Sequence, residues 1–492
     1  MSESPMEFGS GDAPTPRERT LAATALGTAL LQAAPLLFFF IAARRLSPDA
    51  AGVVRILIVL QGLAGLAACM GMPEALLHRL GAAATEAGRI RAAHGASTWL
   101  IVTFPLASAL TTAAVWLVAT LARRSEFIAL LPVAALIGSL GSVSHFAGPA
   151  LAARGRSSAF LGAASLHALL LTTAGLAAPA GAAPMLTAAW LATLPLTVWV
   201  IRGLGTPNRT RAAEMRLEIA AALRYGAPLA GGAVLYLLAY QVDHFTASRM
   251  LTPIDYGLYA AGAWQLPAGT VLQLCQRYML LPALAELSRE GRYREFWALW
   301  RRVAAPALTA GSLLFWLAFW NSEDGLTLLL GNRYAGAGDV FRVYACLLPL
   351  QLIAVALPLW ASGRTRWDVP AAGFFVVTSL TAGILLTPVL GRVGPAVGLA
   401  IGYLGWSLSL TAITSRVLRT PFWNLVPLAP LARGLVIGGA AAAVLRCAVQ
   451  FAAPGSAAGR LALTAIAVVG WIAWEVRRRK GLGGGGGAGS GD

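Results

Sequence analysis

Apolar runs of about 20 residues recur along this chain from end to end, and they restrict its fold more than any other feature. One such run lets a helix cross the hydrocarbon core of a bilayer. Only 12% of the 492 residues are charged, whereas a soluble protein carries roughly a quarter. No polar stretch is long enough for a sizeable soluble domain. We therefore predict an all-α integral membrane protein with about 14 transmembrane helices.

The predicted spans are the apolar stretches between charged residues and Pro or Gly breaks. They cover residues 20–43, 53–77, 96–121, 128–152, 157–178, 184–201, 226–248, 257–282, 304–322, 338–361, 369–388, 393–414, 428–449 and 461–475. They divide the chain into a tail (1–19), six helices (20–202), a linker (203–225), six further helices (226–414), an extra C-terminal pair (428–475) and a basic, then glycine-rich tail (476–492).

Basic residues predict how the chain lies in the membrane. If the N-terminus is cytoplasmic, the segments on that side hold more than twice as many Lys and Arg as those on the other side. Short loops with this excess face the cytoplasm, so we expect both termini inside. The same rule explains the net charge of +17 without nucleic acid as a partner. The Ala- and Arg-rich usage indicates a GC-rich bacterium.

A short motif occurs twice, 205 residues apart: "LSPDAAG" at 46–52 and "LTPIDYG" at 251–257. In both copies proline stops one helix, and glycine allows the next to begin close by. Six predicted spans separate the copies, so both lie on the same face of the membrane. We expect two six-helix lobes, arranged as parallel repeats around a central cavity, plus the two extra C-terminal helices. The alternative is a repeat that serves assembly alone.

Five longer stretches, taken in order, resemble the polysaccharide-transporter branch of the MOP flippase superfamily, the Wzx-type exporters. They are "RRLSPDAAGVV…ACMGMPEALLHRL" (44–80), "LRYGAPLAGGAVLYLLAYQVDHFTASRMLTPIDYGLYAAGAW" (223–264), "LLPALAELSREGRYREFWALWRR" (280–302), "LLGNRYAGAGDVFRVYACLLPLQ" (329–351) and "ASGRTRWDVPAAG…LTPVLGRVGPAVGLAIGYL" (361–404). The resemblance implies a cavity lined by helices 1, 2, 7 and 8, and alternating access without ATP hydrolysis or a cofactor.

The resemblance also implies a cargo. It would be an undecaprenyl-pyrophosphate oligosaccharide, flipped across the bacterial inner (plasma) membrane for surface polysaccharide biosynthesis such as O-antigen or exopolysaccharide. Membrane lipids would be further partners. The coupling ion is left open between H⁺ and Na⁺, and polysaccharide polymerase machinery is a candidate partner.

Asp243 is a carboxylate within predicted span 7. Charges inside a membrane are costly, and they usually face the bundle interior or a wet cavity. Asp243 is therefore either a site that couples transport to H⁺ or another cation, or one member of an ion pair with Arg249 or Arg55.

Predicted span 8 carries a polar stripe. Gln265, Gln273, Gln276 and Arg277 fall on one helical face, and Gly269 on that face leaves room. If this helix lines the cavity, the amides suit sugar hydroxyls and the planar guanidinium of Arg277 suits a phosphate. The alternative is a snorkelling arginine with amides that join helices.

Helices 1 and 2 add three further cavity candidates. Gln32 lies mid-span 1, Gln61 lies in span 2, and Arg55 opens span 2 at its outer side. Pro35 allows a kink in span 1.

Two charged stretches are given simpler interpretations. We expect Glu74, His78 and Arg79 to be solvated at the inner end of span 2. The stretch 285–302 alternates charges with aromatic residues and predicts an amphipathic helix at the membrane surface.

Enzyme chemistry and metal sites are not predicted. The sequence has no paired carboxylates on a long loop, no His/Cys cluster with ligand spacing and no Walker-type glycine loop. The absence of a catalytic loop also counts against a membrane glycosyltransferase. The alternative function is a cation-coupled, MATE-like exporter of small molecules. Such sites favour acidic residues for cationic drugs, whereas one intramembrane Asp and several Arg favour an anionic cargo.

Overall fold

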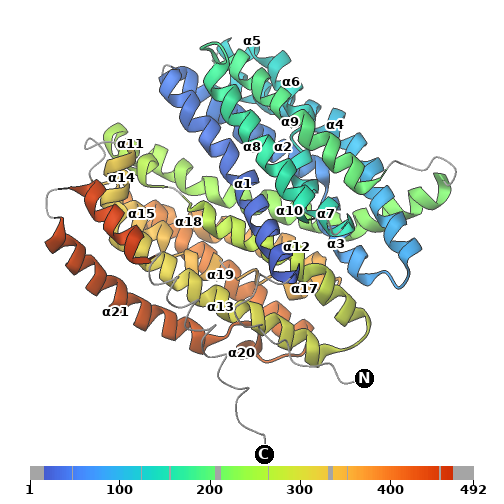
Figure 1. Cartoon of the computed structure of the whole chain (residues 1–492). Helices are drawn as coiled ribbons and strands as arrows, with labels where there is room; N and C mark the ends of the chain where they lie inside the picture. Colours follow the sequence, from blue (N-terminus) through green and yellow to red (C-terminus); the bar gives the residue numbers. More distant parts are fainter. Residues whose placement is uncertain are drawn as a thin grey trace, which may run out of the picture.

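The computed structural model describes residues 16–46, 48–122, 125–154, 157–205, 212–263, 265–330, 336–351, 353–453 and 456–468. Over these ranges the chain is helical and contains no β-strand (Figure 1). The predicted N-terminal tail up to residue 15, the end of the last predicted span and the basic tail lie outside the described residues. The all-helical prediction is confirmed.

The first nine helices are α1 (Pro16–Arg45), α2 (Pro48–Cys69), α3 (Met72–Ala82), α4 (Glu86–Ala122), α5 (Ser125–Ala129), α6 (Leu131–Ser139), α7 (Val143–Arg154), α8 (Ser157–Ala177) and α9 (Ala182–Leu204). The next ten are α10 (Ala212–Met250), α11 (Pro253–Gly262), α12 (Pro267–Arg289), α13 (Tyr293–Trp320), α14 (Ser322–Leu330), α15 (Gly338–Ala345), α16 (Leu348–Gln351), α17 (Leu357–Ala361), α18 (Asp368–Leu390) and α19 (Gly394–Val417). They are followed by α20 (Phe422–Leu425), α21 (Leu428–Ala452) and a final helix, Ala457–Val468.

Interrupted helices leave the predicted count of about 14 spans unconfirmed. Within the described ranges, eight helical stretches are long and apolar enough to cross a membrane, and nine if the bent pair α2–α3 is one span. One of the eight, Thr365–Val417, contains both α18 and α19. The second and fourth predicted spans are broken into shorter helices, and so are the eighth and tenth.

Helix packing repeats along the chain in the order that the sequence motif predicts. The repeated motif opens α2 at Pro48 and α11 at Pro253. Helix α1 packs along α8, and α10 packs along α18, which is the same pairing six spans later. Likewise α8 packs on α9 and α18 on α19, and these pairs lie side by side in Figure 1. We call α1–α9 the N-half and α10–α19 the C-half.

The two halves touch most closely around α3, α10 and α12, near the middle of Figure 1. Gly71, between α2 and α3, has a φ of 70°, a left-handed conformation that glycine adopts freely. A Cβ at Gly71 would clash with the carbonyl oxygen of Gly226 in α10, and one at Gly81 would clash with that of Pro282 in α12. Backbone therefore meets backbone here. We call this region the inner end, because the count of basic residues predicts that it faces the cytoplasm.

The stretch 285–302 differs from its prediction. It is divided between the end of α12 and the start of α13, and α13 continues into the membrane-spanning stretch Tyr293–Trp320. Phe296 and Trp300 are buried in the protein, and the indole Nε1 of Trp300 donates to the carbonyl oxygen of Leu425 at 3.0 Å. The aromatic face meets neighbouring helices rather than lipid, because the helix is held inside the C-half.

The extra C-terminal helices are attached along α13 and α14. Trp316 in α13 donates to the carbonyl oxygen of Leu435 in α21 at 2.8 Å. At the other end of α21, Asp324 of α14 accepts hydrogen bonds from Arg446 and Arg460. Apolar side chains such as Val436 and Val444 are exposed on α21, as expected for a lipid-facing helix.

Candidate functional site

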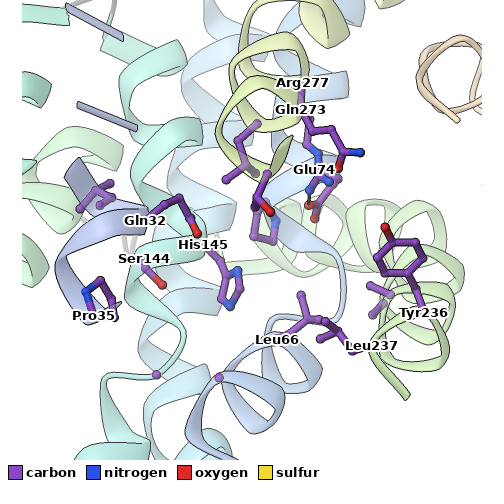
Figure 2. Close-up of a pocket in the computed structure, with 18 of the residues that line it drawn as sticks. Gln32, Pro35, Leu66, Glu74, Ser144, His145, Tyr236, Leu237, Gln273 and Arg277 are labelled. Carbon is purple, nitrogen blue, oxygen red and sulfur yellow. Dashed lines mark hydrogen bonds and ion pairs between the residues drawn. The ribbon is translucent and has the colours of Figure 1, made fainter. Parts of the chain in front are cut away.

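A cavity of about 560 Å³ lies between the N-half and the C-half (Figure 2). The breaks in all four interrupted spans reach it, through Gly71, Gly141, Gln265 and residues 353–356. Non-helical backbone is tolerated at membrane depth only where it is buried in protein or lines a water-filled space. The helix breaks that leave the number of spans unconfirmed therefore line this cavity.

Most of the predicted cavity residues line this space. Five of the seven do so: Gln32, Gln61, Gln265, Gln273 and Arg277. They come from α1 and α2 in the N-half, and from α12 and the break before it in the C-half. Residues far apart in the sequence therefore share one cavity.

Gln276 is a described residue that does not line the cavity. Gln276 is buried, and its Oε1 accepts weakly from the backbone N–H of Ala354 at 3.4 Å. Its amide is held against the non-helical backbone at residues 353–356 instead. The side chain of Arg55 lies outside the described part of the chain, so its place stays a prediction.

Arg277 forms an ion pair that the sequence did not reveal. Its Nη1 lies 2.6 Å from Oε1 of Glu74 in α3, so the pair joins the two halves (Figure 2). The guanidinium also lies over the ring of Trp360, 5.1 Å from the centroid. The Arg277 and Glu74 side chains are only 26% and 14% exposed. Glu74 lines the cavity, so the expectation that it is simply solvated is wrong.

His78 and Arg79 are also engaged rather than solvated. Arg79 binds Glu218 of α10, with its Nε 2.7 Å from Oε1. His78 stacks on Tyr225 at a centroid distance of 4.4 Å. Both contacts join α3 to α10, so they add to the seal between the halves at the inner end.

The C-half wall of the cavity is an interlocked network. The side chain of Gln273 donates to the carbonyl oxygen of Gln351, and Gln351 Nε2 donates to the hydroxyl of Tyr240 at 3.0 Å. Tyr240 and Tyr236 share a hydrogen bond of 3.2 Å, and Tyr236 packs against Trp406 with 5.0 Å between ring centroids. Amide and aromatic groups of this wall are therefore fixed by one another.

The N-half wall differs. Gln32 of α1, Gln61 of α2, and Ser144 and His145 of α7 all line the cavity. Their side chains make no hydrogen bond within the described ranges of the chain. Figure 2 shows Gln32, Ser144 and His145 around one open space. We call these four residues the N-wall quartet.

Helix packing brings the N-wall quartet together. A Cβ at Gly65 would clash with the carbonyl oxygen of Gly141, so α2 lies directly on the break between α6 and α7. Gln61, one turn earlier on α2, is thereby placed next to the first turn of α7. Ser144 and His145 were missed from sequence, because nothing local distinguishes them from interhelical packing residues.

Comparisons with known proteins identify the architecture. No family model and no curated protein matches the sequence. Among solved structures, a MATE in the straight conformation superposes with a TM-score of 0.66 at 14% identity, over 82% of this chain and 96% of that one. The chain has the MATE transporter fold. An outward-facing multidrug resistance MATE family transporter of the MOP superfamily gives 0.61 at 14% identity, over 82% of this chain and 96% of that one.

A third solved structure has the same fold. It is a MOP superfamily transporter from Pyrococcus furiosus, described as having a binding pocket of reverse polarity that suggests a different function. It superposes with a TM-score of 0.65 at 13% identity, over 82% of this chain and 95% of that one. Identities this low show the shared MATE fold alone.

The charges in the cavity of this MATE fold differ from the sequence expectation. Glu74 and Asp368 line it together with Arg277, and Asp368 accepts from Trp360 Nε1 at 3.1 Å. Asp243, the acidic residue that the sequence placed inside the membrane, is not a lining residue. The described lining residues show no excess of arginine, so an anionic cargo cannot be argued from their summed charge and stays a prediction.

Asp243 lies in the core of the C-half. It is 1% exposed and accepts hydrogen bonds from the hydroxyls of Tyr259 in α11 and Tyr344 in α15. Arg249 lies over the ring of Phe245 at 5.5 Å, and no ion pair between Asp243 and Arg249 occurs among the described residues. Two tyrosines therefore hold Asp243 in place of Arg249, and Arg55, the other predicted partner, has a side chain outside the described part of the chain. In the described part of the MATE fold, no group of three or more His, Cys, Asp or Glu side chains could hold a metal ion.

Proposed function

We propose that this protein is a membrane transporter that works by alternating access, with residues 20–202 and 226–414 as its two lobes. A cavity between two repeated halves, built from broken helices, is the usual plan of a secondary transporter. The inner end is sealed by glycine contacts and by the Glu74–Arg277 pair. This arrangement supports an outward-facing state, which must open at the inner end to load cargo from the cytoplasm.

The proposed cargo is an undecaprenyl-pyrophosphate oligosaccharide, flipped across the bacterial inner membrane for surface polysaccharide biosynthesis. The observation that carries this proposal is that glutamines from both halves and aromatic rings such as Tyr236 and Trp406 line one cavity. Amides donate and accept hydrogen bonds, as sugar hydroxyls do. Arg277 would bind the pyrophosphate, because its guanidinium N–H groups other than Nη1 make no hydrogen bond within the described residues.

The same proposal covers the topology and the partners of the protein. Both termini would be cytoplasmic, membrane lipids would surround the protein, and polysaccharide polymerase machinery would receive the flipped cargo. No enzymatic step is required of this chain.

Asp243 is proposed as a proton-coupling site. A carboxylate held by two tyrosine hydroxyls inside the C-half connects α10, α11 and α15, so its protonation would change how these helices hold together. Among the described residues no arginine or lysine pairs with Asp243, and a buried charge without such a partner is costly, which supports a coupling role rather than a fixed ion pair with Arg249.

The second candidate is a cation-coupled exporter of small molecules. Glu74 and Asp368 favour it, because two carboxylates face the cavity and acidic groups suit a cationic drug. Glu74 is paired with Arg277, which leaves Asp368 as the stronger argument for this function.

The deciding experiment compares a deletion strain with its complemented derivatives. We expect lipid-linked saccharide to accumulate in the deletion strain, and the wild-type gene to relieve it. Arg277→Ala and Asp243→Asn should fail to relieve it, although both variants reach the membrane. If no such lipid accumulates, and if the deletion instead increases susceptibility to cationic drugs, the exporter replaces the flippase.

A further inference from the structure

The N-wall quartet has hydrogen-bonding capacity that the protein itself does not use. Gln32, Gln61, Ser144 and His145 come from three helices and open into one cavity. Within the described chain none of their side chains has a hydrogen-bond partner. Polar groups at membrane depth are normally paired across helices. An open polar cluster beside a paired network therefore indicates a place where a ligand completes the hydrogen bonds.

The chemistry of the quartet restricts the ligand. An amide, a hydroxyl and an imidazole can each donate and accept hydrogen bonds. An ammonium or quaternary cation accepts none, and a phosphate oxygen donates none unless it is protonated. A ligand with several hydroxyl groups uses both capacities at all four positions.

The neighbouring charged residues also favour an uncharged ligand. The carboxylate of Glu74 is taken by Arg277, and Asp368 is held by Trp360 in the C-half. The quartet itself contains no carboxylate and no arginine. The cavity volume of about 560 Å³ falls in the range that encloses a small organic ligand.

We propose that Gln32, Gln61, Ser144 and His145 form a binding site for a neutral, polyhydroxylated group, a sugar ring, on the N-half wall. Tyr236 and Trp406 on the C-half wall offer aromatic faces that suit the C–H faces of such a ring. That this sugar belongs to a lipid-linked cargo rests on the proposed function. Arg277 would then hold the phosphate end, and the N-wall quartet would discriminate among saccharides.

Direct binding tests the site without assuming the lipid. The full-length protein is placed in lipid nanodiscs, because maltoside detergents are themselves glycosides. Saturation-transfer NMR then measures binding of the methyl glycosides of glucose, galactose, mannose, rhamnose and N-acetylglucosamine. Tetraethylammonium and inorganic pyrophosphate are the cationic and anionic comparison probes.

Four variants remove the proposed hydrogen bonds with little change of shape: Gln32→Met, Gln61→Met, Ser144→Ala and His145→Phe. Each should weaken the affinity for the bound glycoside by about 2- to 12-fold, the usual effect of one lost hydrogen bond between uncharged groups. Leu31→Met is the matched control, because Leu31 precedes Gln32, lines the same cavity and contributes no side-chain hydrogen bond. If one variant misfolds, the other three still test the site.

Three results would overturn the proposal. The first is tetraethylammonium or pyrophosphate binding with no glycoside binding. The second is glycoside binding that all four variants retain as fully as Leu31→Met. The third is the absence of binding by any of the probes.

The proposed function can fail separately from the site. Glycoside binding without lipid accumulation in the deletion strain would keep the site and reject the lipid-linked cargo. Accumulation without glycoside binding would keep the flippase and reject the site.

Discussion

Gln32 and Gln351 line the same cavity from opposite halves, and they differ in what their amides do. The side-chain amide of Gln351 donates to Tyr240 at 3.0 Å, and the backbone carbonyl oxygen of Gln351 accepts from Gln273. The Gln32 side chain makes no hydrogen bond within the described residues. The C-half wall is thus fixed before cargo arrives, and the N-half wall has open hydrogen-bonding groups. Substitutions on the two walls should therefore change different quantities, stability on one and binding on the other.

The largest expected effect concerns Glu74, which joins the two walls. Glu74→Ala leaves the mostly buried guanidinium of Arg277 without its partner. Loss of one member of a buried pair costs up to about 3–5 kcal/mol in the free energy of unfolding. A thermal melt in nanodiscs should show a large decrease, and the double variant with Arg277→Ala should recover part of it.

An exposed ion pair provides the control for Glu74. Arg292 and Glu295 are 48% and 55% exposed, so Glu295→Ala should leave the free energy of unfolding nearly unchanged. Equal effects at Glu74 and Glu295 would contradict a buried connection between the walls.

The next effect concerns closure of the inner end. Gly71→Ala places a methyl group against the carbonyl oxygen of Gly226 and strains a φ of 70°, so the closed state should lose about 1–3 kcal/mol. With the four native cysteines replaced, Leu77→Cys should react faster with a maleimide when Gly71→Ala is present. Gly62→Ala is the matched control, because nothing lies within 4 Å of a Cβ at Gly62. The same labelling rate for both alanine variants would contradict the glycine seal.

A smaller loss of stability is expected on the C-half wall. Gln351→Met removes the hydrogen bond to Tyr240 and should lower the free energy of unfolding by about 0.5–1.5 kcal/mol. Denaturation of the variant and the wild type in the same nanodiscs measures the difference. An unchanged stability would show that the network contributes little to holding this wall.

The smallest expected effect on stability belongs to the N-half wall. Gln32→Met removes an amide that has no hydrogen-bond partner in the described chain, so the free energy of unfolding should stay within about 0.5 kcal/mol of wild type. The same denaturation assay tests this prediction beside Gln351→Met. A loss as large as that of Gln351→Met would mean that Gln32 serves packing and not ligand binding.

The polar stripe on predicted span 8 shows how far a local pattern can reach. Helical spacing placed Gln265, Gln273 and Arg277 on one face, and all three line the cavity. The same spacing included Gln276, which the structure buries against Ala354. Neighbouring helix positions differ by about 100°, so a stripe drawn from spacing alone is uncertain by one position.

Charged residues were harder to assign, because a partner can lie anywhere in the chain. Glu74 and Arg277 are separated by 203 positions and meet only because α3 packs on α12. Asp243 contacts Tyr259 and Tyr344, and not Arg249, which lies six residues later on α10. The tyrosines could not be singled out, since a tyrosine within an apolar run is equally typical of packing.

The sequence by itself determined that this chain is helical and membrane-spanning, because long apolar runs with few charges have no other stable structure in a bilayer. It also determined the repeat, since the same turn opens α2 and α11. Only the tertiary structure decided which polar groups are paired and which are open. A hydrogen bond depends on atoms within about 3 Å, and the helices that supply those atoms are brought together by packing across the whole chain.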